Sequence, residues 1–155
     1  MKLPSILVLN FDSVQEFVSY KRHVLISIRS RYDSEQPKLP DCIQRVAILY
    51  RWFSDVDDKG YKILSEQYKS ETLDRHVKVI DEDDAERIAS FVVQWAPSVE
   101  LIVVHCDAGI SRSPGIAAAV TKAFGESDDW YFKHFIPNRR VYRLVLEATS
   151  KALQQ

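Results

Sequence analysis

The chain has 155 residues, of which 46% are hydrophobic and 28% charged, a composition ordinary for a globular protein with one core. Its formal net charge of -1 gives no sign of bulk attraction to nucleic acid or to anionic membranes. Two cysteines are too few for a disulfide framework, and the N-terminal segment lacks the features of a signal peptide or a membrane span, so we expect a soluble cytoplasmic protein with a single domain over residues 1–155.

Short apolar runs predict strands in the first third of the chain. They cover residues 5–10, 23–29 and 45–53. A short helix is predicted between the first two strands, beginning at Asp12 or Ser13 and continuing to Tyr20. Residues 30–41 are polar and contain two prolines, which is typical of a loop. The third run is largely apolar, as in a strand that is covered on both faces.

Residues 54–81 have the weakest pattern. A helix over residues 61–68 and a short strand over residues 76–80 are predicted there. Beyond them the pattern predicts a strand over residues 100–105 and helices over residues 83–95, 113–124, 127–135 and 139–153. Because strands alternate with helices, we expect an α/β layer sandwich: a single domain with a mainly parallel central sheet flanked by helices.

The stretch "VVHCDAGISRSPGIAAAV", residues 103–120, joins an apolar strand to a helix of small residues through a tight loop. Such a loop gathers backbone N–H groups that have no partner in the helix, and these groups bind anions. Gly109 permits a turn and a close approach of the ligand, and the Arg112 guanidinium can hold two oxygens of a phosphate-like group. The same positive field would stabilise a thiolate at Cys106.

A thiolate below a bound tetrahedral phosphate is placed for in-line attack on phosphorus. The product of that attack at Cys106 is a covalent phospho-cysteine. Ser113 follows the arginine and can donate a hydrogen bond to the sulfur when the sulfur leaves again. No metal or other cofactor is expected, because the four histidines lack the spacing of metal ligands.

The segment "HCDAGISRS", residues 105–113, resembles the signature loop of the cysteine-dependent protein tyrosine phosphatase superfamily: His-Cys, five residues, Arg, then Ser or Thr. Its "AGISRS" form is most similar to the compact dual-specificity branch, of bacterial and phage type. The Pro-Asn pair at residues 137–138 also resembles that branch. Over the rest of the chain, residues 45–150, the resemblance is one of pattern.

This resemblance implies a phosphatase-type fold and hydrolysis of phosphate monoesters on protein. The expected partner is a phosphorylated protein or peptide that carries phosphotyrosine, with phosphoserine and phosphothreonine as secondary candidates. It assigns catalysis to Cys106, Arg112 and Ser113 together with an aspartate. It assigns phosphate binding to Asp107, Ala108, Gly109, Ile110, Ser111 and Arg112.

The aspartate would supply a proton to the leaving oxygen, as a general acid. Asp55 follows the third predicted strand, whose carboxyl end should lie at the same sheet edge as Cys106 if the strands are parallel. The sequence "WFSDV" around it also resembles a pattern of the compact bacterial and phage-type enzymes. Asp55 is therefore the predicted acid, and residues 59–80 then form an insertion. The alternatives are Asp57, Asp58 and Asp74.

Two loop positions bear on the substrate. Phosphoinositide-directed relatives carry lysines where this chain has Asp107 and Ile110, and an acidic Asp107 would repel a head group with several phosphates. Two other functions stay open. A pseudophosphatase would keep the loop as a phosphate-binding module without effective catalysis. A rhodanese-like sulfur transferase also uses a cysteine loop, but the Arg112-Ser113 ending suits phosphate better.

Overall fold

The computed structural model describes the backbone of all 155 residues and every side chain except those of Ser70, Glu71 and Asp74. Its centre is a four-stranded sheet in the order β1-β4-β2-β3. The strands are β1 (Ser5–Leu9), β2 (His23–Arg29), β3 (Arg45–Trp52) and β4 (Leu101–His105). All three pairings are parallel, so the carboxyl ends of the four strands share one edge of the sheet.

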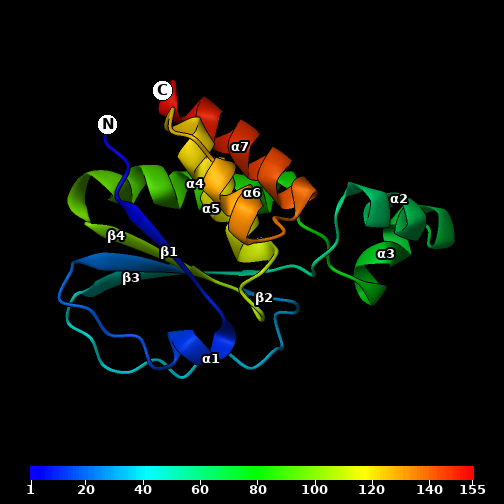
Figure 1. The fold of residues 1–155 in the computed structure, drawn as a ribbon. Helices are drawn as coiled ribbons and strands as arrows, with labels where there is room; N and C mark the ends of the chain where they lie inside the picture. Colours follow the sequence, from blue (N-terminus) through cyan, green and yellow to red (C-terminus); the bar gives the residue numbers. More distant parts are fainter.

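Helices cover both faces of this sheet (Figure 1). The helices of the chain are α1 (Phe11–Val14), α2 (Asp58–Gln67), α3 (Ser70–His76), α4 (Glu82–Trp95), α5 (Arg112–Ala123), α6 (Asp129–His134) and α7 (Arg139–Leu153), with a 3-10 turn η1 (Ala96–Ser98). The main core lies where α4, α5 and α7 pack against one face. A smaller cluster around Val14 of α1 lies on the opposite face.

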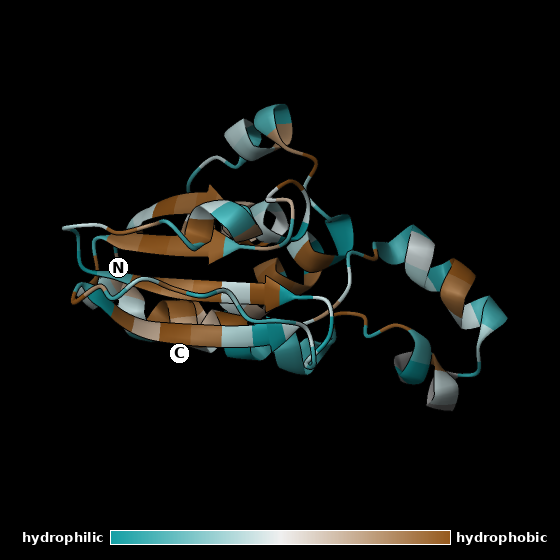
Figure 2. Cartoon of the chain, turned by 90° about the horizontal axis from the view of Figure 1, so that it is seen from below, coloured by the Kyte–Doolittle hydropathy of each residue, from teal (hydrophilic) through white to brown (hydrophobic). Residues whose placement is uncertain are grey.

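Alternation along the central strands explains this division. In β2, Ile26 and Ile28 belong to the main core, whereas Leu25 belongs to the smaller cluster. In β4, Val104 belongs to the main core and Val103 to the smaller cluster. Successive side chains of a strand point to opposite faces, so a strand between two helical layers must be apolar on both sides. Figure 2 shows the strands coloured hydrophobic over most of their lengths.

The predicted α/β layer sandwich is confirmed, with a sheet that is parallel throughout. β3 differs from the expectation, because it is an edge strand whose residues are all partly exposed. The predicted helix to Tyr20 ends at Val14. The predicted strand over residues 76–80 is absent: Val79 and Ile80 are buried, but in an irregular segment after α3. Its apolar residues mark burial in the core rather than pairing in the sheet.

The insertion contains two helices, α2 and α3, where the sequence predicted one. Both stand away from the sheet and its helical layer (Figure 1). α3 begins after Lys69 without a side-chain cap, so the usual signal of a helix start is missing. At the base of α2, Asp58 forms ion pairs with Arg140 at 3.0 Å and with Arg143 at 2.7 Å. The hydrogen bond from Arg143 lowers the pKa of Asp58, and these contacts fix the start of the insertion against α7.

None of the helices in the described chain is both long enough and apolar enough to cross a membrane.

Candidate active site

Cys106 lies at the carboxyl end of β4, in the loop that leads into α5. Its side chain is only 2% exposed and belongs to the main core. The backbone N–H of Gly109 donates to Sγ at 3.3 Å, and the Ser113 Oγ lies 3.1 Å from the same sulfur. A thiolate can only accept hydrogen bonds, so both groups would stabilise the charged sulfur.

Gly109 lets the loop pass close to the end of β1. Its φ of +70° falls in the region that residues with a side chain rarely adopt. A Cβ at this position would lie 3.0 Å from backbone atoms of Leu9 and Asn10. Any other residue would strain the turn and push the loop away from β1, so the glycine is needed for the shape of the loop.

The backbone of the loop turns its carbonyl groups toward neighbouring segments. The carbonyls of Asp107, Ile110 and Ser111 accept hydrogen bonds from the N–H groups of Phe11, Ile136 and Asn138, at 2.9–3.0 Å. Five other N–H groups of this segment donate to no acceptor within the described chain. They belong to Ala108, Ile110, Ser111, Arg112 and Ser113. Unpaired N–H groups at the start of a helix form an anion-binding nest, and the helix dipole adds to their field.

The Arg112 guanidinium is fixed in place beside this nest. The side chain is nearly buried, and Nη1 donates to Ser30 Oγ and to the Phe53 carbonyl, both at 3.0 Å. Nη2 donates to Asp107 Oδ2 at 2.9 Å. Nε makes no hydrogen bond in the described part of the chain. Three acceptors therefore orient the guanidinium and leave its Nε side free for an anion.

Asp107 links this arginine to a second one. Its Oδ1 lies 3.0 Å from Arg29 Nη1, while Oδ2 holds Arg112. The Arg29 guanidinium in turn stacks on the ring of Phe11, 3.9 Å from its centre. The start of α1, the end of β2 and the loop after β4 thus meet in one cluster, because parallel strands end on the same side of the sheet. One carboxylate is shared by two arginines, which leaves the cluster with a net positive charge.

His105 fixes the backbone on the other side of the nucleophile. Its Nδ1 lies 3.1 Å from the Cys106 carbonyl, and its Nε2 lies 2.6 Å from Ser27 Oγ. Burial lowers the pKa of His105, and the charges of Arg29 and Arg112 act in the same direction, which favours the neutral ring. A carbonyl can only accept, so we infer that Nδ1 carries the proton and that the Ser27 hydroxyl donates to Nε2.

Asp55 lies beside the loop. Its Oδ1 accepts a hydrogen bond from Ser111 Oγ at 2.7 Å and another from Asn138 Nδ2 at 2.8 Å. Asn138 is itself fixed, because its Oδ1 caps α7 by accepting from Val141 N at 3.0 Å. Within the described chain, no donor is bound to Oδ2. The carboxyl group is thus anchored through one oxygen, and the other oxygen is available to carry a proton.

The alternative aspartates have other environments. Asp57 caps α2, with its Oδ1 accepting from Gly60 N at 2.8 Å. Asp58 is held by two arginines, and its lowered pKa opposes a role as proton donor. The side chain of Asp74 lies outside the described residues. Of the described candidates, only Asp55 is bound to a residue of the cysteine loop.

The structure therefore brings together all the residues that the sequence assigned to the site. Several partners of these residues were missed: Ser30 and the Phe53 carbonyl for Arg112, and Arg29 for Asp107. One feature of the sequence could have indicated these partners. These three residues directly follow or end predicted strands, as Cys106 does, so a parallel sheet places them at the same edge.

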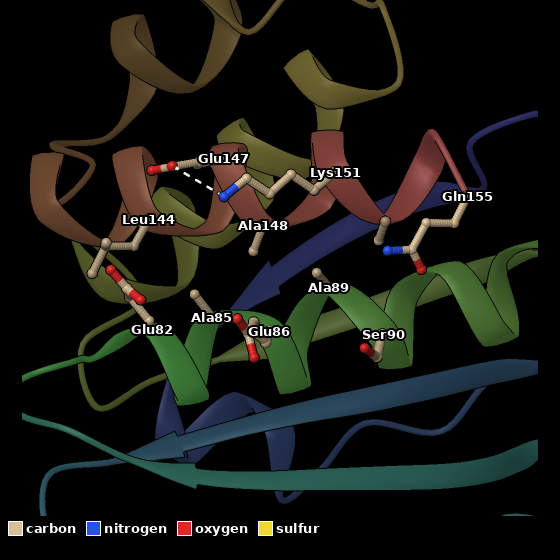
Figure 3. A pocket seen from close by; sticks show the side chains of 11 residues that line it. Glu82, Ala85, Glu86, Ala89, Ser90, Leu144, Glu147, Ala148, Lys151 and Gln155 are labelled. Atoms are coloured by element: carbon tan, nitrogen blue, oxygen red, sulfur yellow. Dashed lines mark ion pairs between the residues drawn. The ribbon is translucent and has the colours of Figure 1, made fainter.

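A separate groove of about 380 Å³ lies between α4 and α7 (Figure 3). Its floor is formed by small side chains such as Ala85, Ala89 and Ala148. Glu147 and Lys151 pair with each other on α7, at 3.4 Å, rather than across the groove. No residue of the cysteine loop lines this groove, so it is not part of the candidate active site.

No protein-family model matches the chain, and no curated protein matches it either. Among the side chains that the structure describes, there is no group of three or more His, Cys, Asp or Glu residues that could hold a metal ion.

Proposed function

We propose that the protein is a phosphatase of the cysteine-dependent type that hydrolyses phosphate monoesters on proteins, phosphotyrosine first among them. One observation carries this proposal: the Cys106 sulfur, the unpaired N–H groups of its loop and the free side of the Arg112 guanidinium occur together. A nucleophile next to an anion-binding nest suits attack on a phosphoryl group.

In the first step, the Cys106 thiolate attacks phosphorus and the P–O bond to the leaving group breaks. The loop N–H groups and Arg112 stabilise the charge on the phosphoryl oxygens. Asp55 transfers its proton to the leaving oxygen, so that an alcohol or phenol departs. In the second step, Asp55, now ionised, accepts a proton from water as the water attacks phosphorus. The S–P bond breaks, and phosphate and the thiolate are regenerated.

The mechanism needs a reduced thiol, and both cysteines of the chain are free. A reducing compartment such as the cytoplasm suits this requirement. A phosphate-binding module without catalysis is the second candidate, because the nest alone would bind phosphate. The anchoring of Asp55 beside the loop favours the enzyme, since a binding module needs no proton donor.

Hydrolysis of a simple aryl phosphate tests the proposal. The purified protein should release the phenol, vanadate should inhibit competitively, and a chelator should leave the rate unchanged. Absence of turnover with tight binding of phosphate would support the binding module instead. A requirement for a metal ion would contradict the cysteine mechanism.

Ser113→Ala should slow the breakdown of the phospho-cysteine more than its formation. The hydroxyl lies 3.1 Å from the sulfur and stabilises it when it becomes a leaving group. Rapid mixing with an aryl phosphate should therefore give a burst of one equivalent of phenol, followed by slow turnover. If both steps slow equally and no burst appears, Ser113 does not have this role.

Asp107→Asn should tighten the binding of inorganic phosphate. The carboxylate neutralises part of the charge on Arg29 and Arg112, and it also repels a dianion in the nest. In this partly exposed site the repulsion between the carboxylate and the dianion is worth about 1 kcal/mol. Its removal should lower the inhibition constant of phosphate by about fivefold. Asp107→Glu keeps the charge and is the matched control. An unchanged or higher constant in Asp107→Asn would contradict the prediction.

A further inference from the structure

Four aliphatic side chains, three exposed and one half-buried, lie around the mouth of the candidate site. We call Val56, Ile63, Ile110 and Ile136 the apolar collar. Ile63 of α2 is 57% exposed, Ile110 of the cysteine loop 48%, and Ile136 before α7 76%; Val56, after β3, is half-buried. Exposed apolar residues are common singly, but a cluster around one opening is typical of a surface that meets a ligand.

The collar is continuous with the candidate general acid. A pocket of about 500 Å³ is lined by Val56, Ile63 and Ile136, and by Asp55 together with its partner Ser111. The N–H of Ile136 also donates to the carbonyl of Ile110 at 3.0 Å, which joins the loop to this wall. The pocket therefore begins at the acid, where the leaving group of a phosphate ester would be.

The pocket lies beside the nucleophile rather than above it. None of Cys106, Gly109 and Arg112 lines it. The phosphoryl group would be held by these three residues, and the side chain that carries it would extend from there past Asp55. The pocket is thus placed for a group next to the phosphorylated residue.

The charges around the pocket do not suit an anionic neighbour. Two charged residues line it besides Asp55, and both have partners: Asp57 caps α2, and the Arg139 guanidinium lies 4.4 Å from the ring centre of Phe132. The remaining walls are mostly aliphatic. A sugar or nucleotide would leave many hydroxyl groups unpaired against such walls, whereas an aliphatic side chain would bury apolar surface on both sides.

We propose that this pocket binds an aliphatic side chain adjacent to the phosphorylated residue of a peptide substrate. The inference rests on the proposed phosphatase function and defines its substrate class: phosphopeptides with a leucine-like neighbour. Because α2 supplies Ile63, the insertion between β3 and α4 becomes part of substrate recognition.

The test uses pairs of phosphotyrosine peptides that differ only in leucine or asparagine at one neighbouring position. One pair varies the residue before phosphotyrosine, and the other varies the residue after it. In one of the two pairs, kcat/KM should be about tenfold higher for leucine, because asparagine loses the apolar contact. Ile63→Ser and Ile136→Ser should each reduce that preference to about threefold or less.

Ile43→Ser is the matched control. Ile43 is 96% exposed and lies just before the amino-terminal end of β3, whereas the candidate site lies at the carboxyl ends of the strands. Its replacement should therefore keep the full preference for leucine. Loss of the preference in this variant too would overturn the inference.

The outcomes separate the inference from the function it rests on. Equal rates for leucine and asparagine in both pairs, with normal turnover of an aryl phosphate, would overturn the proposed role of the apolar collar. The proposed phosphatase function would still stand. Ile63-dependent binding to lipid vesicles without any leucine preference would also overturn it, in favour of a membrane contact. Failure of the wild-type protein to hydrolyse the aryl phosphate would remove the proposed function, and the substrate class with it.

Discussion

Cys106→Ser should reduce the turnover of aryl phosphates and phosphotyrosine peptides to the uncatalysed rate, while binding of the phosphopeptide remains. A serine hydroxyl is far less acidic than a thiol and is not ionised at neutral pH, so the nucleophile is lost. The oxygen can still accept from Gly109 N and Ser113 Oγ, and the contacts that orient Arg112 do not involve the sulfur. The anion-binding nest should therefore survive.

Phenol release and calorimetric titration with a phosphotyrosine peptide measure the two properties on the same preparation. Cys42→Ser is the control, because Cys42 lies in the loop before β3, and its thiol donates to the Ser19 carbonyl, at 3.7 Å. Sustained hydrolysis by Cys106→Ser would exclude the covalent mechanism. Loss of peptide binding would contradict the expectation that the anion-binding nest keeps its shape without the sulfur.

Asp55→Asn should lower the turnover of phosphotyrosine by about 10² to 10⁴-fold, the usual contribution of a positioned proton donor. Asparagine can still accept from Ser111 and Asn138 through its oxygen, so the local geometry should be kept. The loss should be much smaller with an aryl phosphate whose phenolate leaves without a proton. This dependence on the leaving group distinguishes an acid from a residue that only supports the loop.

The pH profile gives an independent readout of the same role. An acid works only while it holds its proton, so the wild-type kcat should fall at alkaline pH. That alkaline limb should flatten in Asp55→Asn. The same substitution in Asp57, Asp58 and Asp74 provides the comparison. If one of these variants shows the leaving-group dependence and Asp55→Asn does not, the acid is misassigned.

The loop and the sheet could be predicted because their causes are local. Glycine at the position that needs φ of +70°, apolar runs of strand length, and a small-residue helix after the loop are all visible in the printed sequence. The alternation of strands and helices then implies a parallel sheet, and a parallel sheet places Asp55 at the same edge as Cys106. Most of the predicted site followed from this reasoning.

The missed features depend on contacts between distant segments. That β3 is an edge strand follows from the strand order, which no local pattern encodes. The contact of Arg112 with Ser30 spans 82 positions, and the contact of Asn138 with Asp55 spans 83. The oxygen of Asn138 caps α7, while its amide nitrogen anchors the candidate acid. Local sequence could indicate only the first of these two contacts.

The central claim is that phosphate is transferred to Cys106. Wild-type protein should be mixed with an excess of an aryl phosphate, quenched in acid within one turnover, digested, and analysed by mass spectrometry. We expect one phosphoryl group on the peptide that contains Cys106 and none in Cys106→Ser. A burst of phenol without this adduct, or a phosphoryl group on another residue such as His105, would contradict the account.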